Sequence, residues 1–314
     1  MHIVLLDLAH PIAWTPWWAA ISFTVGLSVG GFVIALPGRA FGLPRWQRAS
    51  RLGLLVALAA GLVAPPCMLA ALARPDQVGL LYSRPDSSWL ASGAVLVPCY
   101  LAALAVFAWT TMRRDLGAAE GNGWLARLHR AVSFGGGGAP RLRQVAMLFA
   151  AALGIGVMLA TGAELRPAWN SLLLPWHLAV TALAAALGAV LVLDRLANGE
   201  RDADTTVLLA RLTSGVLVLG VMLGRESWGS PAVAVAGWSI VVALMWGDSL
   251  GWLVGLLALG AAWAVRWNLI VTGADWNGIW MLLAPLGMAG LLVALLAGLG
   301  AALPVLGPRR AADL

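Results

Sequence analysis

The chain has 314 residues, of which 61% are hydrophobic and only 11% are charged, and its mean hydropathy is +0.87. A soluble globular domain is about one quarter charged, so this composition excludes one and indicates a polytopic membrane protein. The formal net charge of +6 reflects twenty arginines and no lysine, but no basic stripe on a soluble face accompanies it, which argues against a nucleic-acid-binding module.

Nine apolar segments are candidates to cross a bilayer as helices, which takes about 20 residues each. In chain order, the predicted spans are Trp17–Leu36, Leu52–Ala73, Trp89–Met112, Gln144–Ala163, Leu172–Leu193, Thr206–Leu223, Ala232–Trp246, Leu250–Val265 and Ile279–Leu303. The seventh and eighth are short and are separated only by the sequence GDS, so they form either a tight helical hairpin or one broken, re-entrant element. The sequence therefore predicts one all-α transmembrane bundle of eight or nine spans.

The arginines predict the orientation of the bundle, because basic residues are retained on the cytoplasmic side. With nine spans and the N-terminus outside, fifteen of the twenty arginines lie in inner segments and five lie outside. The glycine-rich loop 113–143 then faces the cytoplasm and is interpreted as a flexible linker. The first residues lack the basic region and the cleavage site of a signal peptide, so we expect the first span to be retained.

Ionisable residues gather at the outer ends of the predicted spans, although the chain otherwise avoids charge. The stretch TGAELRPAWNSLLLPWHLAVTAL, which contains Glu164, Arg166 and His177, joins the fourth span to the fifth, and Arg266 ends the eighth. An ionisable group at membrane depth costs roughly 2.5–3.5 kcal/mol on insertion scales, so such groups are usually paired or functional. The structural alternatives are an ion pair of Glu164 with Arg166 or Arg266, and a hydrogen-bonded packing role for His177.

Cofactor-binding motifs are absent from the sequence. Only His177 of the four histidines lies within a span, whereas a b-type haem held across a bundle uses two axial histidines. Cys67 and Cys99 lie in apolar runs without the spacing of a cluster-binding or zinc motif. No hydrolase or nucleotide-binding motif is present either. We therefore expect no haem, iron–sulfur cluster or other metal in this chain.

Four stretches resemble the NrfD-like membrane subunits of polysulfide, tetrathionate and related molybdopterin oxidoreductases. They are WWAAISFTVGLSVGGF, APPCMLAALARPDQVGLLYSRPDSSWLASGA, TGAELRPAWNSLLLP and RWNLIVTGAD. The second stretch matches the family pattern at Pro75, Tyr82, Ser88, Trp89 and Gly93. It departs from the pattern at Ala71, Ala73 and Gln77, where the family has an acidic residue, a histidine and an arginine. The third stretch is most similar to the tetrathionate-reductase branch.

The resemblance implies a multi-pass subunit of the bacterial inner (cytoplasmic) membrane, within a complex of anaerobic respiration. Such a subunit anchors the complex and binds a quinone or quinol, menaquinone or ubiquinone, at the outer ends of its helices. Its implied partners are an iron–sulfur electron-transfer subunit and a molybdopterin catalytic subunit. The chain would then exchange electrons between the quinone pool and the iron–sulfur partner.

A quinol pocket needs lipid access, a few hydrogen-bond donors and a proton acceptor. The predicted catalytic residue is Glu164, whose carboxylate can accept a proton from the quinol. The residues predicted to bind the quinone are His177, Arg266, Trp89, Trp169, Asn170 and Ser88. The residues predicted to dock a partner are Arg84, Arg166, Arg225 and Glu226, although Arg225 and Glu226 also fit a solvated loop pair worth about 0–1 kcal/mol.

Two other functions are compatible with the sequence. A secondary transporter also places polar groups at broken helices, but its site is expected near the bilayer midplane, whereas the charges here gather at one face. A purely structural anchor would use the outer charges only to dock a soluble partner and would bind no quinone.

Overall fold

The computed structural model describes residues 16–72, 78–79, 82, 89–117, 140–169, 173–197, 202–224, 231–271 and 280–302. At some helix ends, including residues 164–169, it describes the backbone alone. These ranges hold one short 3-10 helix, η1 (Pro44–Trp46), and nine long α-helices. The α-helices are α1 (Pro16–Arg39), α2 (Gln47–Ala71), α4 (Trp89–Gly117), α6 (Pro140–Trp169), α7 (Leu174–Leu196), α8 (Ala203–Leu223), α9 (Pro231–Trp246), α10 (Gly251–Val271) and α11 (Trp280–Ala302).

The predicted all-α bundle is confirmed, and each predicted span coincides with one of these helices. Seven helices are long and apolar enough to cross a membrane, and shorter apolar stretches occupy Ala234–Trp246 of α9 and Pro285–Gly300 of α11. Several helices extend beyond the predicted spans. Helix α6, for example, begins four residues before Gln144 and ends six residues after Ala163, because backbone hydrogen bonds continue where the apolar sequence stops. The chain is a multi-pass membrane protein.

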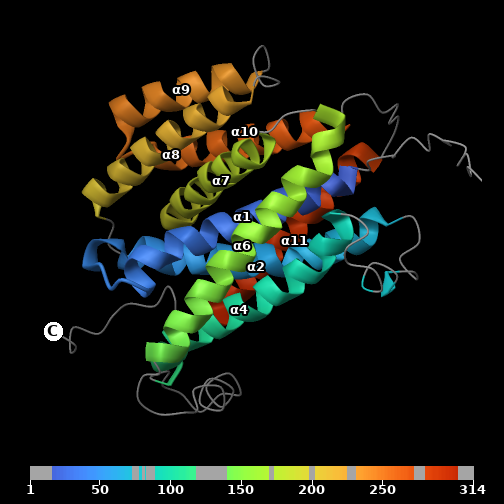
Figure 1. Ribbon diagram of the computed structural model, residues 1–314. Helices are drawn as coiled ribbons and strands as arrows, with labels where there is room; N and C mark the ends of the chain where they lie inside the picture. Colours follow the sequence, from blue (N-terminus) through green and yellow to red (C-terminus); the bar gives the residue numbers. More distant parts are fainter. Residues whose placement is uncertain are drawn as a thin grey trace, which may run out of the picture.

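Helices α9 and α10 form a helical hairpin, which is the first of the two alternatives for this region. Residues 247–250 make the turn between them, and the Leu250 N–H donates to the Trp246 carbonyl at 2.8 Å. Helix α9 packs against both α8 and α10 (Figure 1). The structure therefore favours nine helical segments over eight in the described part of the chain.

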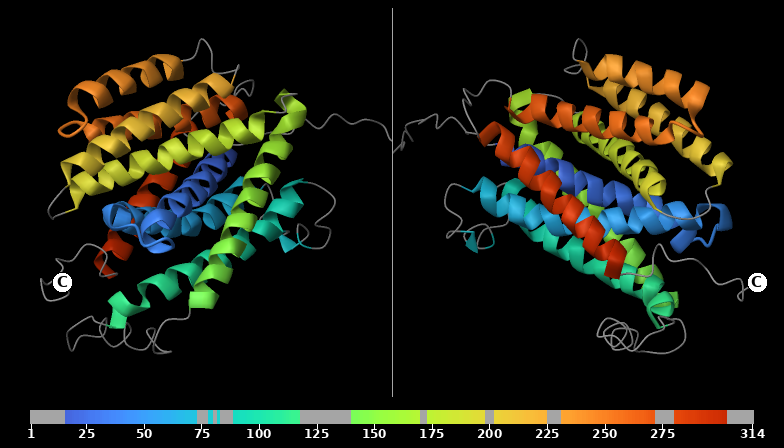
Figure 2. Two further views of the ribbon diagram at one scale, coloured as in Figure 1. Left: turned by 60° about the vertical axis from the view of Figure 1, so that its left-hand side comes forward. Right: turned by 180° about the vertical axis from the view of Figure 1, so that it is seen from behind.

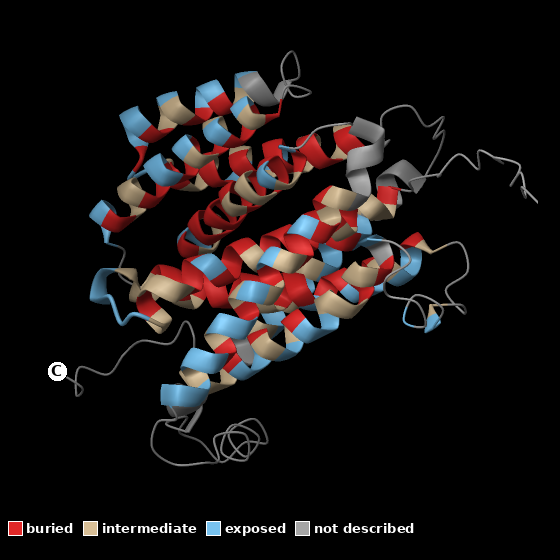
Figure 3. Cartoon of the chain, viewed as in Figure 1, coloured by how far each residue is buried: buried red, intermediate tan, exposed pale blue. Residues whose placement is uncertain are grey.

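The bundle has two groups of helices that meet at α1 and α7. Helices α1, α2, α4 and α6 form one group and α7 to α10 form the other, while α11 returns to pack against α2 and α1 (Figures 1 and 2). Most of α1 and α7 is buried (Figure 3). By contrast α6, α8 and α9 present exposed apolar side chains, such as those of Phe149, Met222 and Trp238, which suit contact with lipid tails.

Pairs of glycines allow the central helices to approach closely. A Cβ atom added at Gly31 of α1 would lie 2.7 Å from the Gly53 carbonyl oxygen of α2. A Cβ atom added at Gly188 of α7 would lie 2.6 Å from the Gly255 carbonyl oxygen of α10. Small residues at such crossings let helix backbones pack in a membrane, where the hydrophobic effect between helices is weak.

Candidate functional site

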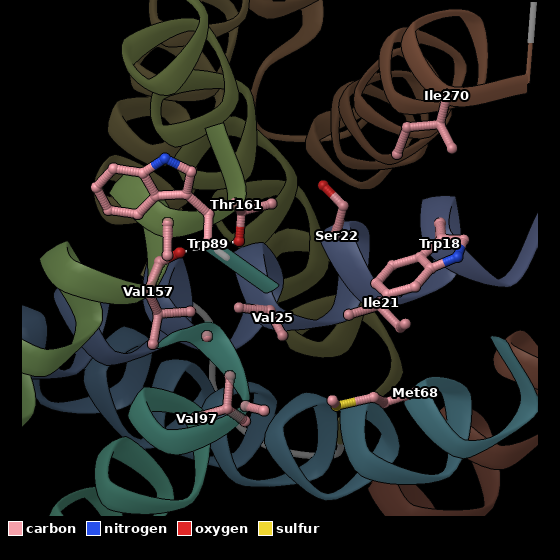
Figure 4. A pocket seen from close by; sticks show the side chains of 13 residues that line it. Trp18, Ile21, Ser22, Val25, Met68, Trp89, Val97, Val157, Thr161 and Ile270 are labelled. Atoms are coloured by element: carbon pink, nitrogen blue, oxygen red, sulfur yellow. Dashed lines mark hydrogen bonds between the residues drawn. The ribbon is translucent and has the colours of Figure 1, made fainter. Parts of the chain in front are cut away.

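A cavity lies between the ends of five helices. We call this the outer end of the bundle, following the predicted orientation, and the opposite end the inner end. The cavity holds about 590 Å³ of atom-free space, including the part open to the outside. Its wall includes Trp18 and Ser22 of α1, Met68 of α2, Trp89 of α4, Thr161 of α6 and Ile270 of α10 (Figure 4).

The wall of this outer cavity is mainly hydrocarbon. Trp18 and Trp89 contribute two indole rings, and the side chain of Trp89 is 55% exposed. Gly93 also lines the cavity, and a Cβ atom added there would meet no atom within 4 Å. Apolar cavities with a few polar groups are typical sites for flat, mostly apolar ligands.

Two hydroxyl groups line the cavity, and they differ in their hydrogen bonds. Thr161 Oγ1 donates to the Val157 carbonyl of its own helix at 2.8 Å. Ser22 is only 5% exposed, and its Oγ has no hydrogen-bond partner among the described residues. The Ser22 hydroxyl points into the space between Thr161 and Ile270 (Figure 4). A buried hydroxyl without a partner costs about 1–3 kcal/mol, so the cavity holds a polar group that a ligand could satisfy.

Arg266 of α10 lies behind this wall and is fully buried, with 0% exposure. Its Nε–H donates to the Ser22 carbonyl at 3.3 Å, and one Nη donates to the Leu178 carbonyl at 3.0 Å. The other Nη donates to Thr181 Oγ1 at 3.2 Å and to the Ala262 carbonyl at 3.0 Å. Arg266 thus joins α1, α7 and α10. It is not among the residues of the cavity wall.

Gly26 of α1 makes room for the guanidinium group. A Cβ atom added at Gly26 would lie 2.9 Å from one Arg266 Nη, closer than real Cβ contacts allow. The ring of Phe23, also on α1, lies 5.7 Å from the guanidinium carbon, within the range of a cation–π contact. Helix α1 therefore has one side that receives Arg266 and another that faces the cavity.

Residues 5–299 match the family model described as polysulphide reductase, NrfD. The chain belongs to the NrfD family. The match spans nearly the whole chain, including all five helices around the outer cavity. No individually curated protein matches the chain. Family membership agrees with the resemblance in the four sequence stretches, and it supports a membrane anchor role in a polysulphide reductase-type complex.

Within this NrfD-family bundle, His177 is buried at the outer end of α7 with 1% exposure. Its Nδ1 lies 2.6 Å from the Gly220 carbonyl oxygen, in the last turn of α8. Carbonyl groups in the last turn of a helix lack helical donors, so a protonated Nδ1 can donate there. The imidazole also packs where a side chain at Gly224 would clash with it. His177 thus contacts the end of α8 and does not line the outer cavity.

The other predicted site residues divide into three groups. Trp89 lines the outer cavity. Glu164, Arg166 and Trp169 lie on the last turns of α6, where only the backbone is described, and Glu164 follows Thr161 by one turn. The predicted residues that lie outside the described ranges are Ser88, Asn170, Arg84, Arg225 and Glu226. Their predicted roles, like those of Glu164, Arg266 and His177, stay predictions.

Sequence reasoning missed Trp18, Ser22 and Thr161 in the cavity wall. A signal for two of them was present, because Trp18 and Ser22 are four residues apart and therefore share one face of α1. Within the described ranges, no group of three His, Cys, Asp or Glu side chains could hold a metal ion.

The inner end of the bundle holds a second, smaller cavity of about 330 Å³. The Arg48 Nε–H donates to the Asp194 carboxylate, and an Arg48 Nη donates to the Asp194 carbonyl at 3.4 Å. Arg45 donates to Thr205 Oγ1 at 3.4 Å, and the Thr205 hydroxyl donates to the Asp202 carboxylate. The hydrogen bond from Thr205 holds the pKa of Asp202 below its usual value. The polar groups that line this cavity therefore bind one another.

Proposed function

We propose that this chain is the membrane anchor and quinone-binding subunit of a respiratory molybdopterin oxidoreductase of the polysulphide or tetrathionate reductase type. The observation that carries the proposal is the outer cavity. Its wall is apolar, two indole rings border it, and one hydroxyl in it has no partner among the described side chains. A quinone ring is flat and apolar with two oxygen atoms, so its surface complements such a wall.

Trp18 and Trp89 are suited to hold the ring. Indole faces stack on flat aromatic ligands, and such pairs add about 0.5–1.5 kcal/mol beyond the burial of surface. Quinones partition into the lipid, so a cavity within the helices of a membrane protein is accessible to them. Family membership supports a membrane anchor role, and a quinone bound in the cavity would give that anchor a part in electron transfer.

Oxidation of a quinol releases two electrons and two protons, and each needs an acceptor. In this proposal an iron–sulfur partner at the outer face takes the electrons and passes them to a molybdopterin subunit. Arg84, Arg166, Arg225 and Glu226 are the proposed docking residues there. Glu164, one turn beyond Thr161 on α6, is the proposed acceptor of both protons, which it takes one after the other and passes to the outer water.

The proposal predicts that Glu164→Gln slows quinol oxidation by the purified complex roughly 10²–10⁴-fold, while the complex remains assembled. Glutamine keeps the shape of the side chain but cannot act as a base. The matched control is Asp248→Asn, which removes an exposed carboxylate in the turn between α9 and α10 and is expected to leave the rate within about threefold of the wild type. Full activity in an assembled Glu164→Gln complex would contradict the proton-acceptor role. If Trp89→Ala also left the activity unchanged, the purely structural anchor would be favoured.

A further inference from the structure

Ser22 is exceptional among the buried hydroxyl groups of the described chain. Eight other serines and threonines are buried there, and each donates to a carbonyl or carboxylate oxygen: Thr24, Ser28, Ser50, Thr181, Thr205, Thr213, Ser214 and Ser239. Most of them bond a carbonyl three or four residues earlier, as serines and threonines in membrane helices usually do. Ser22 makes no such bond, and its hydroxyl points into the outer cavity instead.

The backbone of Ser22 is held from the other side of α1. The Arg266 Nε–H donates to the Ser22 carbonyl at 3.3 Å, and Gly26, which has no side chain, leaves room for the guanidinium group beside α1. One turn beyond Arg266 on α10, Ile270 lines the same cavity as Ser22. The guanidinium group therefore ties α1 to α10 directly behind the cavity wall.

We infer that Ser22 is the residue that hydrogen-bonds one ring oxygen of the bound quinone, and that Arg266 is a positioning residue that holds the Ser22 turn against the cavity. This inference rests on the proposed function and assigns the polar contact within the same site. The Ser22 hydroxyl donates to the ring oxygen of the quinone, or accepts the hydroxyl hydrogen of the quinol, because a serine hydroxyl has both capacities.

The first test of the Ser22 role is the thermal stability of the ligand-free protein. A structural serine stabilises the fold through its hydrogen bond, so its removal lowers the thermal midpoint. The Ser22 hydroxyl has no bond to lose among the described atoms, so Ser22→Ala is expected to leave the midpoint equal or higher. Ser28→Ala is the comparison, because Ser28 donates to the Ala57 carbonyl at 2.7 Å and its midpoint is expected to fall.

The second signature is the affinity for a soluble quinone, 2,3-dimethyl-1,4-naphthoquinone, titrated into the full-length chain in detergent. Ser22→Ala is expected to bind it about tenfold more weakly, which corresponds to about 1.4 kcal/mol and to the loss of one hydrogen bond. Thr24→Val is the matched control. It removes a buried hydroxyl of the same helix that does not line the cavity and that donates to the Ala20 carbonyl at 2.8 Å, and it is expected to change the affinity less than about twofold.

Three results separate the failure of this inference from failure of the proposed function. If the wild-type chain and its complex bind no naphthoquinone, the proposed function is wrong. If Ser22→Ala binds naphthoquinone as tightly as the wild type while Trp89→Ala does not, the ligand binds in the outer cavity but makes no hydrogen bond with Ser22. A fall in the thermal midpoint of ligand-free Ser22→Ala, with unchanged affinity, would make Ser22 a structural residue.

The role of Arg266 is tested by a double-mutant cycle with Ser22. Arg266→Lys is expected to weaken naphthoquinone binding about fivefold in the wild-type background and to have no further effect in Ser22→Ala. Gly26→Ala tests the same contact independently, because its Cβ would lie 2.9 Å from an Arg266 Nη, so the guanidinium group that donates to the Ser22 carbonyl is expected to shift. Equal losses of affinity in both backgrounds, for both variants, would show that Arg266 stabilises the bundle without acting through Ser22.

Discussion

The two ends of the bundle both place polar side chains at helix termini, but they satisfy them differently. At the inner end Arg48 bonds Asp194, and Arg45 bonds Thr205. At the outer end the cavity is apolar, and the hydroxyl of Ser22 has no partner among the described residues. Polar residues at a helix end are therefore a poor guide to a ligand site by themselves. The informative feature is a buried polar group that its neighbours leave unsatisfied.

The two cavities also differ in how many polar side chains line them. The inner cavity is bordered by two arginines and two aspartates, whose formal charges balance. Arg48 links the start of α2 to the end of α7, and Arg45 links η1 to the start of α8. The outer cavity needs only one hydroxyl to be specific, because its remaining wall already suits a flat apolar ring. The inner end thus cross-links helices, whereas the outer end is the site that the proposed function gives to the ligand.

Filling the outer cavity is expected to give the largest effect. Gly93→Leu places a side chain in open space on the cavity wall, so the affinity for naphthoquinone should fall roughly hundredfold. The fold should not be weakened, because replacing a glycine in a helix interior stabilises the helix by about 1 kcal/mol. Gly215→Leu is the matched control, because its Cβ also meets open space, but on the exposed face of α8. Both variants are titrated with naphthoquinone. Wild-type affinity in Gly93→Leu would show that the ligand does not bind in the outer cavity.

Breaking the ion pair at the inner end should produce the opposite pattern. Asp194→Ala removes the carboxylate partner of the Arg48 guanidinium, whose side chain is 35% exposed, and we expect a loss of about 1 kcal/mol of unfolding free energy. Naphthoquinone affinity should stay unchanged. Asp194→Asn keeps an acceptor of the same size and should lose less. Thermal midpoints and naphthoquinone titrations of the variants test this. If Asp194→Ala lost affinity but not stability, the inner end would not be a purely structural region.

The smallest effect is expected at Asp202, the N-cap residue of α8. Its carboxylate accepts from the Thr205 hydroxyl and from the Asp204 N–H, and its pKa is lowered mainly by the Thr205 bond. A lowered pKa stabilises the folded state above the unfolded pKa of about 3.9, and this contribution is lost as the pH falls through the folded value. Asp202→Ala should therefore lower the thermal midpoint slightly at pH 7, and the difference from wild type should shrink toward pH 3. A difference independent of pH would contradict this.

Much of the fold follows from the sequence because membrane spans are specified locally. Each needs only a run of apolar residues long enough to cross the lipid, so all nine described α-helices could be predicted with their ends to within about six residues. The relation of α9 to α10 could not, because the sequence GDS fits both a hairpin and a broken element. Packing of α9 against α8 and α10 distinguishes the two, and that packing involves residues distant in the sequence.

The candidate site was predictable only in part. Trp89 was expected at the site from the family pattern, and it lines the cavity. Arg266 and His177 stand out in the sequence because charge is rare there, but their bonds to Leu178 and to Gly220 depend on which helices are neighbours. The spacing of Ser22 from Trp18 shows only that the two share a face of α1, and a serine in an apolar helix normally bonds its own backbone, so the sequence does not reveal an unsatisfied hydroxyl. Its importance arises from a bond that it does not make within the described chain.

The order of synthesis suits the position of Arg266 on a late helix. The chain is made from its N-terminus, so α1 and α7 are synthesised before α10. An arginine within a membrane helix costs roughly 2.5–3.5 kcal/mol to insert, and the acceptors of Arg266 on Ser22 and Leu178 belong to helices that are made before it. If the arginine stood on α1 instead, it would be synthesised before any helix that could offer it an acceptor. Helices α1 and α7 thus provide carbonyl acceptors for an arginine that is synthesised later. In a chain truncated before α10, the Ser22 and Leu178 carbonyls lack this donor.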